Sequence, residues 1–159
     1  MKDLSLEAAK KIYKNQYWDR SRCDDFNNWL TALLVFDTAV NMGVGAAGRL
    51  LQESYNLLTG DGIAVDGAIG PQTLSSVNGY DHPRDINFWF NILRGRRYVG
   101  IVNNNSSQRR FIRGWGRRLQ AMTAKIVCSE LAEVERKNEE PPSFAEALDI
   151  VTARLKEVI

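Results

Sequence analysis

The sequence has few of the residue types that build metal sites and disulfide scaffolds. Among its 159 residues there is one histidine, His82, and there are two cysteines, Cys23 and Cys128. The cysteines lie far apart and form no C-x-x-C pair, which argues against a zinc site and against a disulfide-stapled fold. We expect two free thiols, because unpaired cysteine usually behaves as a small buried apolar residue, with a bridge between them as the alternative.

Long apolar runs are also missing. No segment approaches the roughly 18 apolar residues of a membrane span, and the charged first three residues are not followed by the apolar region of a signal peptide. The composition, with 44% hydrophobic and 25% charged residues, is that of an ordinary globular protein. We expect a soluble protein without membrane insertion that stays in the cytoplasm, where it is made, unless something else exports it.

Acidic residues are absent from one long stretch. Residues 86–129 contain nine bases and no acid, whereas residues 1–85 contain eleven acids and eight bases, and residues 130–159 contain eight acids and four bases. The nine bases are Arg94, Arg96, Arg97, Arg109, Arg110, Arg113, Arg117, Arg118 and Lys125. This basic block is a candidate anion-binding surface. The alternative is that the acidic C-terminal part folds against it and neutralises it.

Almost every segment has the apolar spacing of a helix. The centre of a predicted helix over 25–42 is apolar on every side, which is typical of a helix buried inside a fold. Asp24 and Asp25 are expected to cap its start. Further helices are predicted at 46–58, at 83–102 and from Ser107 onward, and Ser143 with Glu146 forms a capping box before a last helix. The predicted fold class is all-α, with about six to seven helices around a central buried helix.

Two polar residues interrupt the central helix. Asp37 and Asn41 are one turn apart and continue the apolar line of Leu30 and Leu34, so they enter or border the core. An unpaired buried carboxylate is costly, so Asp37 must be paired, hydrogen-bonded or open to a water-filled cleft. Two hypotheses remain: Asp37 pairs with an arginine of the basic block or holds helix ends, or it lines a substrate groove.

The glycine-rich loop 61–70 contains two Asp-Gly steps, and Pro71 opens the next helix. Asp-Gly steps occur in calcium loops, but this loop lacks the further carboxylates and the closing glutamate of an EF-hand. Turn formation is the better account. We therefore expect no metal and no cofactor.

Five spaced groups of residues stand out together. They are Tyr17-Trp18-Asp19, Phe36-Asp37-Thr38-Ala39-Val40-Asn41-Met42-Gly43, Leu50-Leu51-Gln52, Asp66-Gly67-Ala68-Ile69-Gly70-Pro71-Gln72-Thr73-Leu74 and Phe111-Ile112-Arg113-Gly114-Trp115. In order and spacing they resemble the lysozyme-like muramidases of glycoside hydrolase family 108, followed by their small peptidoglycan-binding module. The resemblance implies a lysozyme-like helical fold. It also implies that 1–58 is the remainder of a catalytic subdomain, 59–129 a peptidoglycan-binding-like subdomain and 130–159 an acidic helical extension.

The resemblance also implies a function. In that family, a glutamate of an N-terminal Glu-Gly-Gly segment is the general acid that cleaves the bond following N-acetylmuramic acid. These 159 residues contain no Glu-Gly pair, and they begin at what resembles the family's second helix. We therefore expect a glycoside hydrolase lineage of the phage or prophage endolysin type, acting at the cell wall if released or exported. The chain should bind glycan but hydrolyse it weakly or not at all, and no catalytic residue is assigned.

The residues expected to bind glycan are Tyr17, Trp18, Asp19, Asp37, Asn41, Gln52, Arg94, Arg97 and Trp115. The group 17–19 suits a saccharide wall, because an aromatic face stacks on a sugar ring while an acid bonds to hydroxyls. Core packing is the alternative for Trp18 and Trp115.

Two functions of other classes remain. The basic block could bind nucleic acid or another polyanion, with Trp89, Tyr98 and Trp115 stacking on bases. This hypothesis ranks below glycan binding because no nucleic-acid-binding motif accompanies the charge. The third is an interaction protein that forms a homo-oligomer through the helix at 143–159.

Overall fold

The computed structural model describes residues 5–60, 62–132 and 143–155. These residues form seven α-helices and three short helical segments, without a strand among them. The elements are α1 (Leu6–Tyr13), η1 (Lys14–Trp18), η2 (Cys23–Asp25), α2 (Trp29–Met42), α3 (Val44–Thr59), α4 (Pro71–Asn78), α5 (Pro83–Asn104), η3 (Ser106–Phe111), α6 (Ile112–Ala132) and α7 (Phe144–Leu155). The predicted all-α fold is confirmed.

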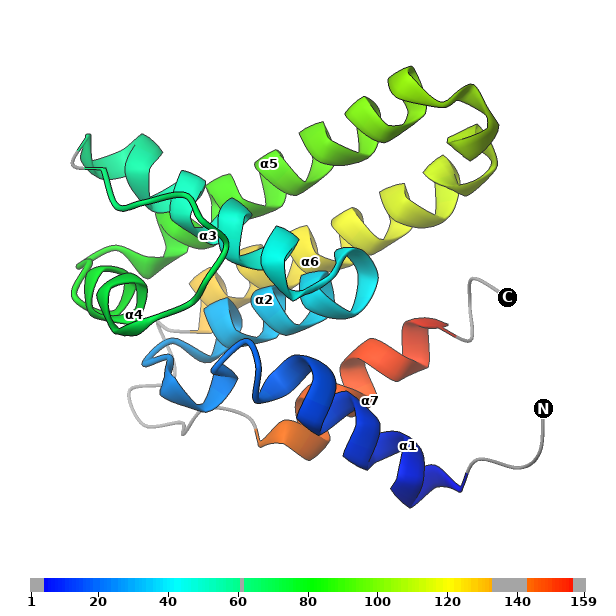
Figure 1. Cartoon of the computed structure of the whole chain (residues 1–159), viewed down its shortest axis with the longest axis horizontal. Helices are drawn as coiled ribbons and strands as arrows, with labels where there is room; N and C mark the ends of the chain where they lie inside the picture. The colour runs from blue at the N-terminus through cyan, green and yellow to red at the C-terminus, as the bar shows by residue number, and fades with distance from the viewer. Residues whose placement is uncertain (1–4, 61, 133–142, 156–159) are drawn as a thin grey trace.

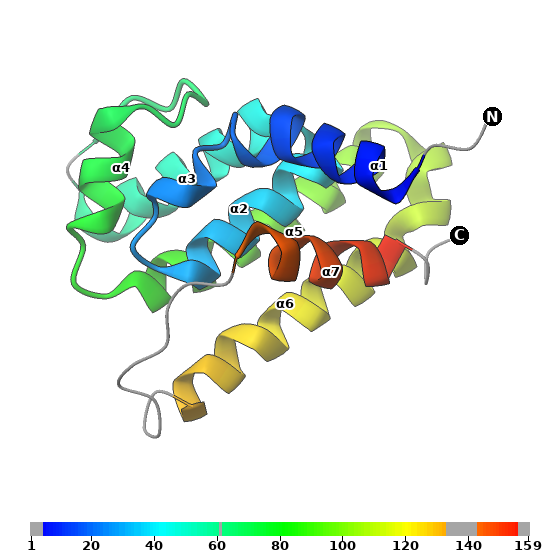
Figure 2. The same ribbon diagram turned by 90° about the horizontal axis from the view of Figure 1, so that it is seen from below.

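Helix α2 lies at the centre of the molecule (Figures 1 and 2). Every residue from Leu30 to Ala39 is buried, and the helix packs against α3, α5, α6 and α7. Because α2 is apolar on all sides, only a position surrounded by other helices removes its whole surface from water. The predicted central helix is confirmed.

The prediction that Asp24 or Asp25 caps this helix is wrong. Asp24 instead accepts a hydrogen bond from Trp18 Nε1 at 2.8 Å, and Asp25 accepts one from Arg22 Nε at 2.7 Å. The backbone is extended at Phe26, which separates the short turn η2 from α2. Helix α2 therefore begins at Trp29, after Asn28, whose side chain accepts the Thr31 N–H at 3.0 Å.

Helices α5 and α6 form a long hairpin that is closed by η3 at the end remote from α4 (Figure 1). The predicted helix from Ser107 is α-helical only from Ile112, because residues 106–111 form a tighter 3-10 turn. Asn105 caps this turn by accepting the Ser107 N–H at 3.1 Å. None of the described helices combines the length and apolarity needed to cross a membrane.

Helix α7 lies beside α1 and completes the core (Figures 1 and 2). The ring of Phe144 packs edge-on against Trp18 and Phe36, with centroid distances of 5.4 and 6.0 Å. The capping box is confirmed, because the Ser143 N–H donates to Glu146 Oε2 at 2.8 Å and the Glu146 N–H donates to Ser143 Oγ at 3.5 Å. Residues far apart in the sequence thus meet in one aromatic cluster.

The two cysteines are free, and their environments differ. Cys23 is buried beside the carbonyl of Ala32, whereas Cys128 is exposed on α6. Burial raises the pKa of the Cys23 thiol well above its usual range. The thiolate is the reactive form of cysteine, so Cys23 is protected both by burial and by its protonation.

We expect one thiol to react with Ellman's reagent in the folded protein and two after unfolding in guanidinium chloride. Cys128→Ser should abolish the reaction of the folded protein, and Cys23→Ser should preserve it. The measurement is the absorbance released per chain before and after denaturant. Rapid reaction of both thiols under native conditions would contradict the burial of Cys23.

Candidate functional site

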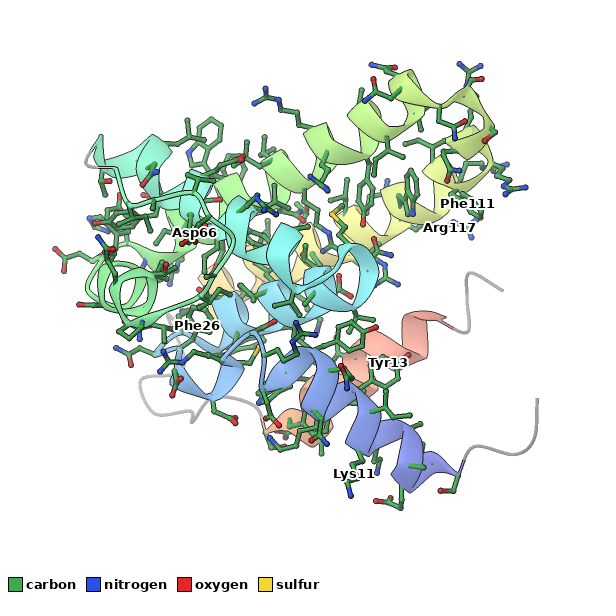
Figure 3. All side chains as sticks on the ribbon, viewed as in Figure 1. Lys11, Tyr13, Phe26, Asp66, Phe111 and Arg117 are labelled. Atoms are coloured by element: carbon green, nitrogen blue, oxygen red, sulfur yellow. The ribbon has the colours of Figure 1, made fainter. Side chains whose placement is uncertain are left out.

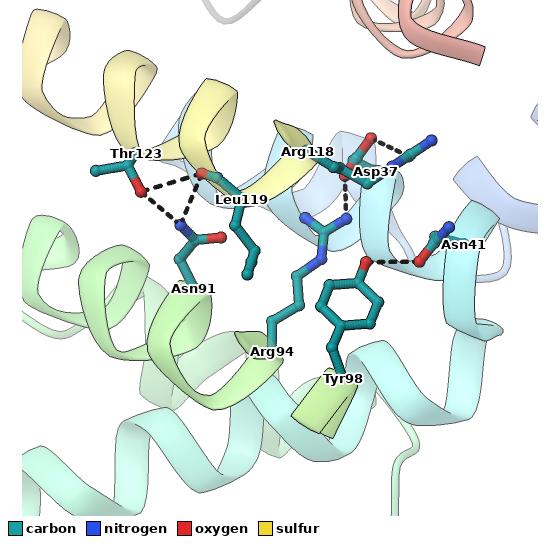
Figure 4. A network of polar contacts seen from close by, with 8 residues as sticks. All are labelled: Asp37, Asn41, Asn91, Arg94, Tyr98, Arg118, Leu119 and Thr123. Atoms are coloured by element: carbon teal, nitrogen blue, oxygen red, sulfur yellow. Dashed lines mark hydrogen bonds and ion pairs between the residues drawn. The ribbon is translucent and has the colours of Figure 1, made fainter. Parts of the chain in front are cut away.

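A cluster of charged side chains lies buried where α2 meets the hairpin (Figure 4). Arg94 of α5 donates through Nη2 to Asp37 Oδ2, and Arg118 of α6 donates through Nη1 to Asp37 Oδ1 at 2.7 Å. Asp37 and Arg94 are fully buried, and Arg118 is 5% exposed. One carboxylate therefore ties three helices together. Of the two hypotheses for Asp37, pairing with arginines of the basic block is the one observed.

The cluster holds one more positive charge than negative. Burial alone would lower the pKa of the Arg94 guanidinium, but Asp37 and Tyr98 together outweigh burial and leave that pKa raised. Nε and Nη1 of Arg94 are buried and have no hydrogen-bond partner in the described part of the chain. Asp37 accepts charge-assisted bonds from two guanidinium groups, so both of its carboxylate oxygens are already engaged within the protein.

An aromatic pair adjoins this cluster. The Tyr98 hydroxyl donates to Asn41 Oδ1 at 2.6 Å, and the Tyr98 ring stacks on Trp115 with centroids 4.8 Å apart and an interplanar angle of 14°. Burial raises the pKa of the Tyr98 phenol. One face of the Trp115 indole is thus covered by Tyr98.

The group 17–19 is divided between core and surface. Trp18 is only 2% exposed, and its ring packs against Phe36 and Phe144. Tyr17 is half-buried, and Asp19 is exposed and accepts a hydrogen bond from Lys14 Nζ at 2.7 Å. Trp18 therefore packs in the core, which was the alternative to a role in stacking on a sugar.

Gln52 of α3 holds the loop that precedes α4. Its Nε2 lies 2.8 Å from Asp66 Oδ1 and 3.0 Å from the Ala68 carbonyl, and its Oε1 accepts the Gly67 N–H at 2.8 Å. The hydrogen bond from Gln52 is the main cause of a lowered pKa at Asp66, and the Ala68 N–H adds to it. The Gln52 side chain is 1% exposed, and both its amide nitrogen and its amide oxygen bind the loop.

The same loop approaches α3 through glycine. A Cβ added at Gly48 would lie 2.2 Å from the Gly67 carbonyl oxygen, a distance that real Cβ atoms do not show. Gly67 itself has a φ of +84°, which a residue with a side chain adopts only with strain. Gly48 and Gly67 together let two backbones touch.

A pocket of about 340 Å³ opens between α3 and α5, next to this loop. Its lining residues are Glu53, Asn56, Leu57, Val65, Leu93 and Arg96. The Asn56 amide bonds to both backbone groups of Ile63, each at 2.9 Å, and so fixes the loop that supplies Val65.

A second pocket of about 150 Å³ lies near the start of α2 and is rich in asparagine. Asn78, one of its lining residues, accepts the Asn27 N–H and donates to the Asp25 carbonyl, so its amide joins two segments of the chain. In the described residues, no three His, Cys, Asp or Glu side chains are grouped to hold a metal ion.

The residues predicted to bind glycan fall into separate groups on different elements. Asp37 and Arg94 are paired, and Tyr98 connects Asn41 to Trp115 beside them. The group 17–19 follows α1, Gln52 holds the loop, and Arg97 is exposed on α5. Their roles in glycan binding remain predictions.

Sequence reasoning missed the pocket residues Glu53 and Asn56, and it placed Arg96 only within the basic block. Part of the signal was present, because Glu53, Asn56 and Leu57 are three and four residues apart and so share one face of a helix. The residues that face them from α5 and from the loop could not be identified without the packing of these elements.

Comparison with protein families gives two matches along the chain. Residues 1–43 match the family described as Glycosyl hydrolase 108, and residues 46–120 match the family described as Predicted Peptidoglycan domain. The resemblance inferred from the sequence motifs is confirmed: a segment that matches glycosyl hydrolase 108 is followed by one that matches a predicted peptidoglycan domain. The matches support a protein of glycoside hydrolase lineage that is directed at cell-wall glycan. No curated protein matches the chain in sequence.

Among solved structures, the chain is similar to the structure of Brucella abortus SagA. The TM-score is 0.65 at 23% sequence identity, and the alignment covers 80% of this chain and 66% of that chain. The likeness shows a shared fold. This chain corresponds to slightly less than two thirds of the SagA chain.

Asp37→Asn should lower the free energy of unfolding by about 3–5 kcal/mol, because it leaves two buried guanidinium groups without their counter-charge. The measurement is urea unfolding followed by circular dichroism. Asp85→Asn, at an exposed acid in the first turn of α5, is the control and should cost at most about 1 kcal/mol.

The double variant Asp37→Asn with Arg118→Met should be more stable than Asp37→Asn alone, because it removes one unpaired buried charge. A free energy of unfolding that Asp37→Asn leaves unchanged would show that the cluster is not a buried ion network.

Gly48→Ala should destabilise the protein by about 1–3 kcal/mol, because the new methyl group would force α3 and the loop apart. Gly100→Ala is the matched control inside α5, where an added Cβ meets nothing within 4 Å. Removing a helical glycine there should stabilise the protein by up to about 1 kcal/mol. Equal effects of the two substitutions on the thermal midpoint would rule out the close contact at Gly67.

Proposed function

We propose that this chain, a glycosyl hydrolase 108 segment joined to a peptidoglycan module, is a muramidase-like protein of a cell-wall lytic system. It binds the glycan strands of peptidoglycan and hydrolyses them weakly or not at all. The observation that carries the proposal is the order of the two family matches, over residues 1–43 and 46–120. Peptidoglycan is the one polymer that accounts for both.

Hydrolysis of a glycosidic bond needs a carboxylic acid that stays protonated in apolar surroundings and donates to the leaving oxygen. Asp37 is the one fully buried acid among the side chains that the structure describes, and both of its carboxylate oxygens accept hydrogen bonds from arginines. Asp19 and Asp24 are exposed and already accept hydrogen bonds from Lys14 and Trp18. These acids do not meet the requirement.

Glu53 differs from these acids in its surroundings. It is half-buried, lines the pocket of about 340 Å³ and has no ion-pair partner among the described residues. Unlike Asp37, Asp19 and Asp24, it is free to approach a ligand in that pocket. The clearing assay therefore includes Glu53→Gln.

The finer assignments follow from the same proposal. A protein of this type would belong to a phage or prophage endolysin system and act at the cell wall. The division into 1–58, 59–129 and 130–159 is part of the proposal, as is a homo-oligomer contact through 143–159. Within the chain, Phe144, Ala147 and Leu148 of that segment already pack into the core.

A second candidate function, the binding of nucleic acid or another polyanion, is supported by the surface of the α5–α6 hairpin. Six arginines are exposed there without an ion pair to a described acid, namely Arg96, Arg97, Arg109, Arg110, Arg113 and Arg117. Phe111 and Arg117 lie toward the far end of the hairpin (Figure 3). Glu146 and Asp149 of α7 form no ion pair with them, so the described acids of the C-terminal part do not neutralise this surface.

The purified protein should sediment with peptidoglycan sacculi without clearing their turbidity. Retention should persist at about 1 M salt, where the Debye length is about 3 Å. Electrostatic binding of arginines to the phosphates of a polyanion is largely screened at that salt concentration. Cellulose, a glycan without N-acetyl groups or peptides, is the control polymer. The fraction of protein in the pellet and the optical density over time are measured.

Failure to sediment with sacculi would contradict the proposal. Retention that disappears in high salt and is matched by binding to DNA would favour the polyanion function instead. Clearing that is lost in Glu53→Gln would identify an active acid within these residues and overturn the expected lack of hydrolysis.

A further inference from the structure

The pocket between α3 and α5 contains an acid and a base that do not neutralise each other. Glu53 of α3 and Arg96 of α5 both line it, and neither takes part in an ion pair or a hydrogen bond with another described residue. By contrast, Asp37 is buried, and both of its carboxylate oxygens accept hydrogen bonds from arginines. The pocket therefore offers one anionic and one cationic contact to a ligand.

The walls of the pocket are held in place before any ligand arrives. Val65 lies between two loop segments that α3 fixes: Ile63 is bonded to Asn56, and Asp66 and Gly67 are bonded to Gln52. Gln52 and Asn56 are four residues apart and thus face the loop from one side of the helix. A preorganised wall lowers the entropic cost of binding.

The remaining surface of the pocket is aliphatic. Leu93 is 6% exposed and forms the floor, whereas Leu57 and Val65 are 60% and 41% exposed. Leucine and valine side chains exposed to this degree beside a pocket offer apolar area that a ligand can cover. No aromatic residue is among the lining residues, so the pocket lacks the stacking surface that suits a sugar ring.

We propose that this pocket binds the peptide part of peptidoglycan, at a short segment that carries a free carboxylate and a free ammonium group. This inference rests on the proposed function, because it takes peptidoglycan as the polymer. The stem peptides of peptidoglycan carry carboxylates, small aliphatic side chains and, where a diamino acid is not cross-linked, a free amine. The glycan strands carry no ammonium group.

Each ligand group has a counterpart in the pocket. The planar guanidinium of Arg96 binds a carboxylate through two parallel hydrogen bonds, and the Glu53 carboxylate accepts from the ammonium group. Leu57, Val65 and Leu93 contact the aliphatic part. A volume of about 340 Å³ is at the lower end of the range for small-ligand sites, which suits the end of a peptide and excludes a whole strand.

The test is a titration with the tripeptide L-alanyl-γ-D-glutamyl-meso-diaminopimelate, followed by amide chemical shifts of the full chain. The shifts of Val65, Leu93 and Arg96 should move. Arg96→Gln and Glu53→Gln should each weaken binding by about tenfold or more, as expected for the loss of one charge-assisted contact. The tripeptide with both amino groups acetylated should bind as weakly to the wild type as the free tripeptide does to Glu53→Gln.

Arg20→Gln is the charge-matched control, because Arg20 is an exposed arginine that neither lines the pocket nor belongs to the residues predicted to bind glycan. It should keep the wild-type affinity. Thermal midpoints of all variants should agree, since Glu53 and Arg96 take no part in the core. Equal affinity in Arg96→Gln and the wild type, or an equal loss in Arg20→Gln, would overturn the pocket assignment.

Sedimentation separates this inference from the proposed function. Sacculi treated with an amidase, which removes the stem peptides, should retain less protein than untreated sacculi. If untreated and amidase-treated sacculi both retain the protein and the tripeptide does not bind, the pocket assignment is overturned and glycan binding is left in place. Tripeptide binding without retention on sacculi would count against the proposed function and not against the pocket.

Discussion

The burial of one carboxylate, Asp37, constrains how the helices of this protein pack. Helix α2 is apolar on all sides and lies at the centre, so a charge on it is tolerated only where opposite charges enter the core with it. Arg94 and Arg118 supply those charges from α5 and α6. This pairing fixes the face that each hairpin helix turns inward, and the neighbouring Arg97 and Arg117 are exposed as a result.

Much of the fold could be predicted from local sequence. The uniform apolarity of α2 and the capping box at Ser143 and Glu146 depend on residues within a few positions of one another. The assignment of Asp24 as a helix cap failed because its partner is the indole of Trp18, which is held by an aromatic contact with Phe144. Such a contact over more than a hundred residues leaves no periodic signal in the sequence.

The candidate site was less predictable than the fold. The motif residues Asp37 and Gln52 stood out because each is polar on an otherwise apolar helix, but their sequence positions did not reveal their partners. Asp37 needed two arginines from a distant hairpin, and Gln52 needed the backbone of the loop around Gly67. In the sequence, Arg96 is one surface arginine among several. Only the packing of α3 against α5 shows that it lines the same pocket as Glu53.

Ligand recognition requires polar groups that the fold has not already used. Asp37 and Gln52 are buried, and their oxygens are taken by arginines and by backbone N–H groups, so a ligand could reach them only by breaking those bonds. Glu53 and Arg96 are accessible and unpaired, and the aliphatic side chains beside them are partly exposed. The residues that make the sequence recognisable therefore hold the scaffold together, and the residues free to bind a ligand are less distinctive ones on α3 and α5.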